Sequence, residues 1–314
     1  ALALPKVPDH AEAIQQARAA FGQGIAWLQA RWPAARLQAS NASLDDLAHR
    51  HLELAYYGED DRPLASAFGD WFTAAATALA GVAPSTSPVR GRIALISGHW
   101  TLGTISAYFG TWIGALRNAG WEVDLIQVDP SSDTQTDALA RDASTFLHLT
   151  GSLKDVVETL HRRAPGVILY PEVGLSPRVH VLAALRLAPV QIAAWGHPVT
   201  SGLASIDYWL SSAEMEPDDA DTHYRERLVT LPALGTRYVP ASTAARSPRT
   251  ELGLADHHHL YVVPHAAVKL HPTLDAMLVA IALRDPSAQF LLFEDGTPAL
   301  TLQIARRLQA AFGA

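Results

Sequence analysis

Apolar positions in the first 80 residues repeat at the spacing of helices. One helix face is predicted to collect Ile14, Ala17, Phe21, Ile25 and Leu28. Asp9 is expected to cap this helix, with the Glu12 carboxylate reaching back toward it. Ser43 and Asp46 open a second capped segment, and an alanine-rich helix is predicted over 64–79. These segments indicate a helical pre-domain, which we assign to residues 1–86.

After a Pro- and Ser-rich linker at 81–88, short apolar runs alternate with helical segments. The predicted strands are 92–97, 121–128, 144–149, 166–170, 190–194, 206–210 and 228–231. The helices predicted between them are 102–119, 152–163 and 178–187. Near-continuous apolar strands joined by helices favour a parallel sheet covered on both faces, with ligands at the carboxyl ends of the strands. This Rossmann-like domain is predicted to span 87–240.

A second α/β unit is predicted after an Ala-, Ser-, Pro- and Arg-rich connection at 237–249. Its elements are strands at 259–263 and 289–293, a helix at 272–283 and a final helix from Pro298. They form only the opening of another doubly wound domain, over 241–314, and such a fragment would leave much apolar surface exposed. We therefore expect further sequence or another chain to complete it.

The composition excludes several classes of protein. The 24 Lys and Arg residues against 31 Asp and Glu give a formal charge of -7, which argues against a nucleic-acid-binding surface. The absence of cysteine excludes disulfides, thiolate zinc sites and a cysteine nucleophile, and is consistent with a reducing compartment. The first ten residues do not read as a signal peptide, and the apolar runs are too short to span a bilayer. We expect a cytoplasmic protein without nucleic-acid or membrane partners.

Residues 196–202, Gly-His-Pro-Val-Thr-Ser-Gly, directly follow the predicted strand 190–194. This position places backbone N–H groups and the Thr200 and Ser201 hydroxyls at the ligand-binding edge of the sheet, although an ordinary turn has the same composition. His197 suits hydrogen bonding to a sugar or phosphate, or proton transfer, because an imidazole titrates near neutral pH. A polar surface histidine is the alternative.

Two further strand ends carry candidate residues. Glu172, in Tyr-Pro-Glu-Val-Gly at 170–174, suits contact with a substrate hydroxyl, and an exposed loop acid is the alternative. The turn Ser-Gly-His-Trp-Thr-Leu-Gly at 97–103 has glycines for a tight bend but is not a dinucleotide fingerprint. Lys269 lies between a strand and the next helix, where its ammonium group suits a diphosphate leaving group as negative charge grows on it. A solvated lysine is the alternative.

Two patterns resemble metal sites. Asp218-Asp-Ala-Asp221 has the Asp-x-Asp spacing of metal-dependent sugar transferases, but we favour capping of a helix start for these acids. The histidines at 257–259, with His265 and His271, include consecutive residues that point to opposite sides of an extended chain. A loop cluster is therefore favoured, and no metal ion is predicted.

Ordered blocks of the chain resemble bacterial O-GlcNAc-transferase-like (SPINDLY-type) proteins, glycosyltransferase family 41. The blocks are Leu-Arg-Leu-Ala-Pro-Val-Gln at 185–191, Trp-Gly-His-Pro-Val-Thr-Ser-Gly at 195–202, Ile-Asp-Tyr at 206–208 and Glu-Met-Glu-Pro at 214–217. His-Tyr at 223–224 and Leu-Pro at 231–232 continue the match. The stretch 51–62 is similar to a pre-domain motif of many of these sequences. The resemblance covers most of the chain.

The resemblance implies an α/β fold of the GT-B type, with two Rossmann-like domains, the second truncated, after a helical pre-domain. It implies inverting transfer of a sugar, chiefly N-acetylglucosamine, from a UDP donor to Ser or Thr hydroxyls of an acceptor protein or peptide, without a metal ion or other cofactor. An N-glycosyltransferase, a transferase of another hexose and a non-catalytic protein-binding relative are the alternatives. Because later βα units supply most donor contacts in the resembling enzymes, we expect the chain taken alone to be inactive.

The resemblance also implies roles for single residues. In the resembling enzymes the lysine that matches Lys269 contacts the nucleotide diphosphate, and a histidine near the first turn enters the cleft. Here either His99 fills that role or Trp100 has replaced it. The predicted catalytic residues are His99, His197 and Glu172. The residues predicted to bind the donor are Lys269, Gly196, Pro198, Thr200, Ser201 and Gly202.

Overall fold

The computed structural model describes residues 2–49, 52–81, 88–238, 247–255, 257–294 and 296–313. Residues 82–87 of the predicted linker and 239–246 of the predicted connection lie outside these described residues. The chain divides into two compact units, of which the smaller comprises 1–22, 53–59 and 240–314 and the larger 23–52 and 60–239. The predicted pre-domain segments are thus shared between the two units, and the three predicted domain boundaries stay a prediction.

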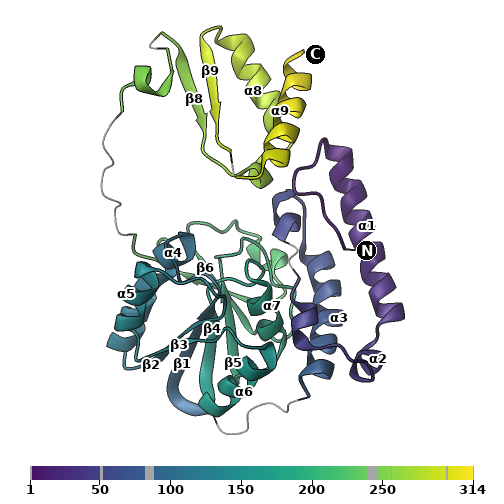
Figure 1. The fold of residues 1–314 in the computed structure, drawn as a ribbon, viewed down its shortest axis with the longest axis vertical. Helices are drawn as coiled ribbons and strands as arrows, with labels where there is room; N and C mark the ends of the chain where they lie inside the picture. Colours follow the sequence, from purple (N-terminus) through teal and green to yellow (C-terminus); the bar gives the residue numbers. More distant parts are fainter. Residues whose placement is uncertain are drawn as a thin grey trace. The chain divides into compact units, whose positions relative to one another are not determined.

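A seven-stranded parallel sheet forms the centre of the larger unit (Figure 1). Its order is β3-β2-β1-β4-β5-β6-β7, and every neighbouring pair is parallel. The strands are β1 (Val89–Ser97), β2 (Glu122–Gln127), β3 (Thr145–His148), β4 (Pro165–Tyr170), β5 (Val190–Ala194), β6 (Tyr208–Ser212) and β7 (Arg227–Leu231). The predicted parallel sheet and all seven of its predicted strands are confirmed.

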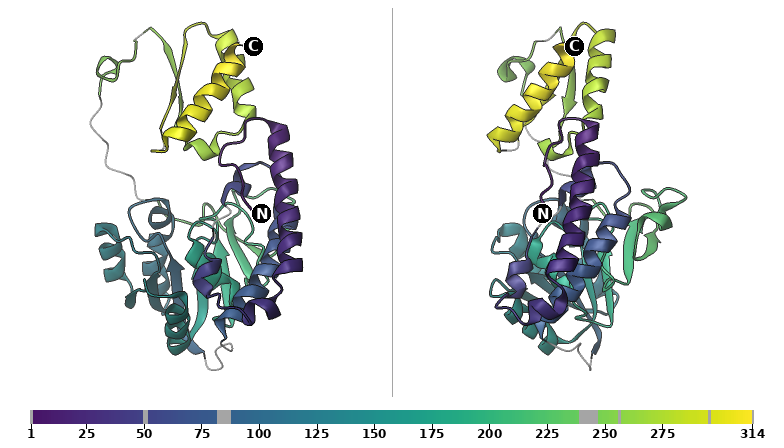
Figure 2. Two further views of the ribbon diagram at one scale, coloured as in Figure 1. Left: turned by 45° about the vertical axis from the view of Figure 1, so that its right-hand side comes forward. Right: turned by 90° about the vertical axis from the view of Figure 1, so that its right-hand side faces the viewer.

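Helices cover both faces of this sheet (Figures 1 and 2). Helices α4 (Thr104–Asn118) and α5 (Thr134–Asp142) lie on one face, and α6 (Leu153–Arg163) and α7 (Pro177–Ala184) lie on the other. Helix α4 buries Ile105, Phe109 and Ile113 against the apolar side chains of β1 and β2. Because each such side chain contributes about 1.5–3 kcal/mol when buried, this layer forms a large part of the core.

Helix α5 is absent from the predicted elements, because only Thr136 and Leu139 of it are buried and no apolar face stands out. Its start is nevertheless marked in the sequence. The Asp133 carboxylate accepts hydrogen bonds from the backbone N–H groups of Gln135 (2.9 Å) and Thr136 (3.0 Å). Such an N-cap stabilises a helix by about 1 kcal/mol, so the cap is the signal that identifies α5.

The helices predicted before the sheet are confirmed as α1 (Ala11–Arg31), the 3-10 helix η1 (Leu44–Leu47) and α3 (Arg62–Ala80). The structure adds two short helices that were not predicted, α2 (Ala34–Gln38) and the 3-10 helix η2 (Leu52–Tyr56). The predicted Asp9 cap is wrong. The His10 ring nitrogen accepts from the Ala13 N–H (3.2 Å), whereas the Asp9 carboxylate accepts from Gln303 (2.9 Å). None of the helices in the described part of the chain is long and apolar enough to cross a membrane.

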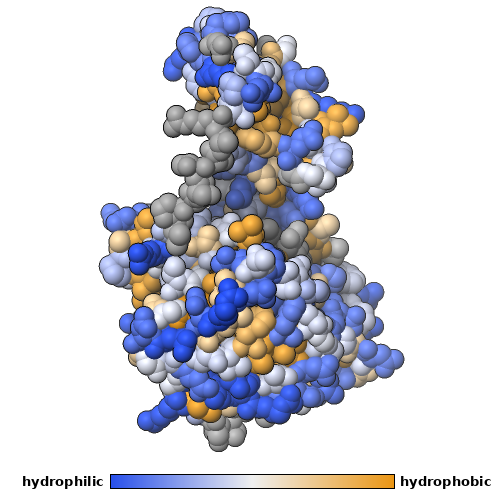
Figure 3. Space-filling model, turned by 60° about the vertical axis from the view of Figure 1, so that its left-hand side comes forward, coloured by the Kyte–Doolittle hydropathy of each residue, from blue (hydrophilic) through white to orange (hydrophobic). Residues whose placement is uncertain are grey.

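The smaller unit contains the parallel strands β8 (His259–Val263) and β9 (Ala288–Leu292) with α8 (Thr273–Arg284) and α9 (Pro298–Gly313). Its core joins Val7 from the chain start to Ala267, Leu270 and Ile304. Apolar side chains of this unit stay exposed, as predicted for an incomplete sheet, and Leu283 is 81% exposed. Figure 3 shows separate apolar patches among hydrophilic residues on one face of the molecule.

Candidate functional site

The candidate site lies at the carboxyl edge of the larger sheet, where β1 and β4 are neighbours. The chain leaves β1 toward α4 on one face and leaves β4 toward α7 on the other face. This reversal is the topological switch point, at which doubly wound sheets bind their ligands. His99, Glu172 and His197 follow β1, β4 and β5, three strands that are adjacent in the sheet.

Glu172 is fully buried beneath this edge, so the interpretation as an exposed loop acid is wrong. Its carboxylate accepts hydrogen bonds from the Ser97 hydroxyl (3.2 Å) and from the backbone N–H groups of Gly98 (3.4 Å), Leu175 (3.2 Å) and Ser176 (3.2 Å). Burial raises the pKa of Glu172 to about 8, although three of these hydrogen bonds lower it. Glu172 therefore ties the turns after β1 and β4 together and is largely protonated at neutral pH.

Asp129 is a second carboxylate at this edge, which the sequence analysis does not single out. Its Oδ1 accepts from the Ser176 hydroxyl at 2.9 Å, and its Oδ2 lies 2.3 Å from the position that a Cβ on Gly98 would take. Only glycine fits at position 98 for this reason. The negative charge of Asp129 also contributes to the raised pKa of Glu172. An aspartate two residues beyond the end of β2 is the signal that would have indicated it.

His197 is 7% exposed and lies against the turn after β4. Its ring atoms are 3.0–3.3 Å from the position that a Cβ on Gly174 would take. Nδ1 is 3.4 Å from the Val199 carbonyl oxygen, whereas Nε2 has no hydrogen-bond partner among the described residues. Burial lowers the pKa of His197 to about 4, so the prediction that its charge is poised near neutral pH is wrong. The imidazole is neutral and keeps one nitrogen available.

His99 and Trp100 are neighbours in the turn after β1 but differ in burial. Trp100 is fully buried in the core, and its indole N–H donates to the Ile126 carbonyl at 3.1 Å. Trp100 therefore does not replace a cleft histidine. His99 is half-buried in the same turn, which the Gln127 amide fixes by donating to the Gly98 carbonyl at 2.8 Å. Of the two residues, His99 is the more exposed, and its contact with a ligand stays a prediction.

The loop 196–202 begins at the candidate site. The Gly196 N–H donates to the Pro171 carbonyl at 3.0 Å, and a Cβ on Gly196 would lie 3.1 Å from that of Glu172. The structure thus brings Gly196 and His197 together with Glu172, whereas Pro198 is exposed.

The second half of the loop is held inside the larger unit. The Thr200 hydroxyl donates to the Glu226 carboxylate at 2.6 Å, and the Ser201 hydroxyl and N–H donate to the same group. All three side chains are buried. These hydroxyls therefore anchor the loop through Glu226, and their predicted contact with a donor stays a prediction. Gly202 follows with φ +68° against the Ala65 backbone of α3.

Lys269 belongs to the smaller unit, in the 3-10 helix η5 (Ala267–Lys269) between β8 and α8. Its position shortly before the first turn of α8 is as predicted from the sequence. The side chain is exposed, and Nζ lies 5.9 Å from the centre of the Tyr56 ring, within the range of a cation–π interaction. The Tyr56 ring therefore provides a platform beside the ammonium group, and contact of this group with a donor stays a prediction.

The two patterns with metal-site character show no such site. Among the described residues, no group of three His, Asp or Glu side chains is arranged to hold a metal ion. Asp218 and Asp219 precede the short 3-10 helix η3 (Ala220–His223), but the Asp219 side chain makes no capping bond, so the capping interpretation is wrong for it. His259 contacts Asp285 at 2.7 Å, so its side chain is bonded to a carboxylate and not to the other histidines.

A doubly wound parallel sheet with polar groups gathered at its switch point, followed by a second parallel α/β unit, defines a protein of GT-B-type architecture. The solved structure of a mutant O-GlcNAc transferase from Thermobaculum terrenum has this fold in common with the chain, with a TM-score of 0.61 and 18% sequence identity. The match covers 98% of the present chain and 66% of the solved chain. The predicted fold class is therefore confirmed.

Sequence comparison gives shorter matches. The chain is 41% identical over 61 residues to a protein of Solanum lycopersicum, and 36% identical over 63 residues to one of Eustoma exaltatum subsp. russellianum. Both bear the name "Probable UDP-N-acetylglucosamine--peptide N-acetylglucosaminyltransferase SPINDLY". Each match covers about a fifth of the present chain (19% and 20%) and 7% of the relative, and no model of a protein family matches. The predicted resemblance to SPINDLY-type, O-GlcNAc-transferase-like proteins is thus confirmed.

Proposed function

We propose that the chain is part of a glycosyltransferase that moves a sugar from a UDP donor to Ser or Thr hydroxyls of an acceptor protein, with inversion at the anomeric carbon. The observation that carries the proposal is the cluster of Glu172, His197 and the turn after β1 at the switch point of an O-GlcNAc-transferase-like fold. The names of the similar proteins support N-acetylglucosamine as the transferred sugar. The absence of cysteine supports a cytoplasmic location.

In this reaction the acceptor oxygen attacks the anomeric carbon, its proton passes to the leaving diphosphate, the bond from that carbon to the diphosphate breaks, and UDP leaves. Neutral His197 has a nitrogen available to hydrogen-bond a substrate hydroxyl. Glu172 acts as a positioning residue, because it ties together the turn after β1, which carries His99, and the turn after β4, against which His197 lies. Negative charge develops on the diphosphate as UDP leaves, and a nearby cation stabilises it. We assign this role to Lys269, without a metal ion.

Measurement of UDP affinity for the full-length wild type and for full-length Lys269→Ala tests the proposal. Lys154→Ala is the matched control, since Lys154 is an exposed lysine on α6. We expect Lys269→Ala to weaken UDP binding about tenfold, which corresponds to about 1.4 kcal/mol, and the control to bind as the wild type does. Absence of UDP binding in all three proteins would contradict the proposal and favour the non-catalytic, protein-binding alternative.

A screen of UDP-sugar hydrolysis by the full-length protein then separates the remaining alternatives. Release of UDP from UDP-N-acetylglucosamine supports the proposed donor, and preferential hydrolysis of a UDP-hexose supports the other hexosyltransferase. Transfer to a peptide that contains Asn but no Ser or Thr would identify an N-glycosyltransferase.

A further inference from the structure

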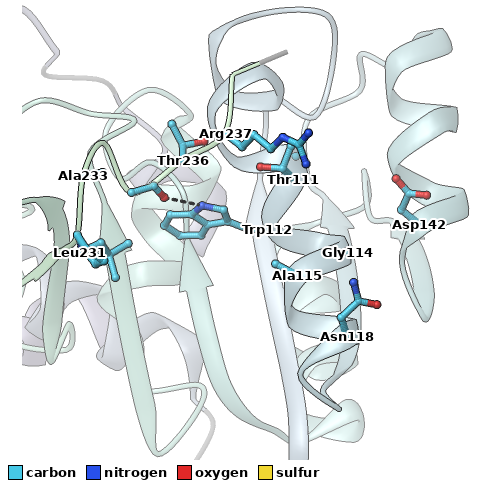
Figure 4. A pocket seen from close by; sticks show the side chains of 13 residues that line it. Thr111, Trp112, Gly114, Ala115, Asn118, Asp142, Leu231, Ala233, Thr236 and Arg237 are labelled. Atoms are coloured by element: carbon cyan, nitrogen blue, oxygen red, sulfur yellow. Dashed lines mark hydrogen bonds between the residues drawn. The ribbon is translucent and has the colours of Figure 1, made fainter.

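A groove runs along helix α4 of the larger unit (Figure 4). It consists of two cavities, of about 740 and 360 Å³, which share the lining residues Gly110, Thr111 and Asp142. One wall is helix α5, and the other is the segment 231–238 that follows β7. All of these parts belong to the larger unit. The groove is therefore a feature of this unit alone.

The floor of the groove is made of small residues. A Cβ on Gly114 would meet no atom within 4 Å, and Ala115 beside it is exposed. The indole N–H of Trp112 donates to the Gly235 carbonyl at 3.0 Å, so this side chain presents only ring atoms to a ligand (Figure 4). Apart from Trp112, the residues of α4 that line the groove are small or medium-sized, which allows a backbone to approach closely. The 15 residues of α4 make the floor about 22 Å long, which matches six or seven extended residues.

Polar groups are placed along this floor. Ser106 is one of the residues that line the smaller cavity, but its hydroxyl oxygen is buried and has no hydrogen-bond partner in the described part of the chain. The amides of Gln135 and Asn118 lie near opposite ends of the groove, and each can donate and accept.

We propose that this groove binds an extended polypeptide segment, and, since this rests on the proposed function, that the segment is the acceptor chain. A peptide backbone offers alternating N–H and C=O groups that match the spaced amides of Gln135 and Asn118. The groove also begins at Leu102 and Gly103, in the turn that carries His99. An acceptor chain bound in the groove therefore passes the turn that carries His99.

The absence of cysteine from the chain allows a test by disulfide tethering. Asn118→Cys places a single thiol at the end of the groove, and Glu158→Cys on the exposed face of α6 is the matched control. Each full-length variant is incubated, under mildly reducing conditions, with a pool of dodecapeptides that have a central Ser, randomised flanks and a terminal thiol. A thiol derivative of N-acetylglucosamine is the second probe. Mass spectrometry measures the captured fraction.

We expect at least tenfold more peptide capture at Asn118→Cys than at the control, and little capture of the sugar. Adding Gly114→Leu fills the groove without a clash, because its Cβ site is open, and we expect it to abolish the excess. Equal capture at both positions, preferential capture of the sugar, or no effect of Gly114→Leu would overturn the proposal. UDP affinity, measured separately, distinguishes failure of the transferase proposal from failure of the groove.

Discussion

Glu172 and His197 show how burial sets the charge of single residues at the candidate site. Removal from water disfavours the charged form of both groups, so it raises the pKa of Glu172 to about 8 and lowers that of His197 to about 4. At pH 7 both side chains are mainly neutral. These two residues therefore offer hydrogen-bonding groups rather than charges, and this suits recognition of uncharged sugar hydroxyls.

The pKa of Glu172 predicts a pH-dependent stability. Since this pKa is raised from 4.5 to about 8, the folded state binds a proton that the unfolded state has lost between these pH values. The contribution of protonated Glu172 is thus fully present below pH 4.5 and is lost as the pH rises through 8. We expect Glu172→Gln, which stays neutral, to be more stable relative to the wild type at pH 9 than at pH 5, by a few kcal/mol.

Urea unfolding at pH 5, 7 and 9 measures this difference. Glu158→Gln, an exposed substitution on α6, is the control and should follow the wild type at every pH. A stability difference between Glu172→Gln and the wild type that does not change from pH 5 to pH 9 would show that Glu172 is not buried with a raised pKa.

At the scale of elements, the loop 196–202 is fixed to helix α3 by backbone contact. Gly202 has φ +68°, and a Cβ there would lie 2.2 Å from the Ala65 carbonyl oxygen. Gly91 in β1 has φ +75° but no atom within 4 Å of its Cβ position. Replacement of either glycine by alanine costs about 1 kcal/mol of backbone strain, but only at position 202 does the new Cβ also collide with another atom.

We therefore expect Gly202→Ala to lower the free energy of unfolding by at least about 2 kcal/mol more than Gly91→Ala. Thermal or urea unfolding of both variants measures the difference. Similar losses for the two variants would mean that the loop does not pack against α3.

The elements of the sheet were predictable from the sequence because buried parallel strands need continuous apolar runs. The strand 190–194 is an example that was predicted to the residue. Helix α5 was not predicted, because a helix with so few apolar residues has no periodic apolar face. The polar contacts were harder to predict from the sequence. The partner of Thr200 is Glu226, 26 residues further along the chain, and no local pattern reveals such a pairing.

At the scale of the whole molecule, the two compact units have separate cores, so damage to one is expected to spare the other. Arg307 and Asp275 form a buried ion pair at 2.7 Å inside the smaller unit. Arg307 also donates to the carbonyls of Pro8 (2.9 Å) and Leu270 (2.8 Å), which joins the chain start to this unit. Removal of the guanidinium group leaves the Asp275 charge buried without its partner and removes the donor from the Pro8 and Leu270 carbonyls.

Arg307→Met should therefore destabilise the smaller unit by about 3–5 kcal/mol, which is the usual effect of breaking a buried ion pair from one side. Hydrogen exchange measured by mass spectrometry should show lost protection in α8, α9, β8 and β9, with β1, β4 and β5 unchanged. Arg306→Met, an exposed neighbour on α9, is the control. Adding Asp275→Leu removes the uncompensated charge and should restore part of the protection. Loss of protection across the seven-stranded sheet as well would instead mean that the two units unfold as one.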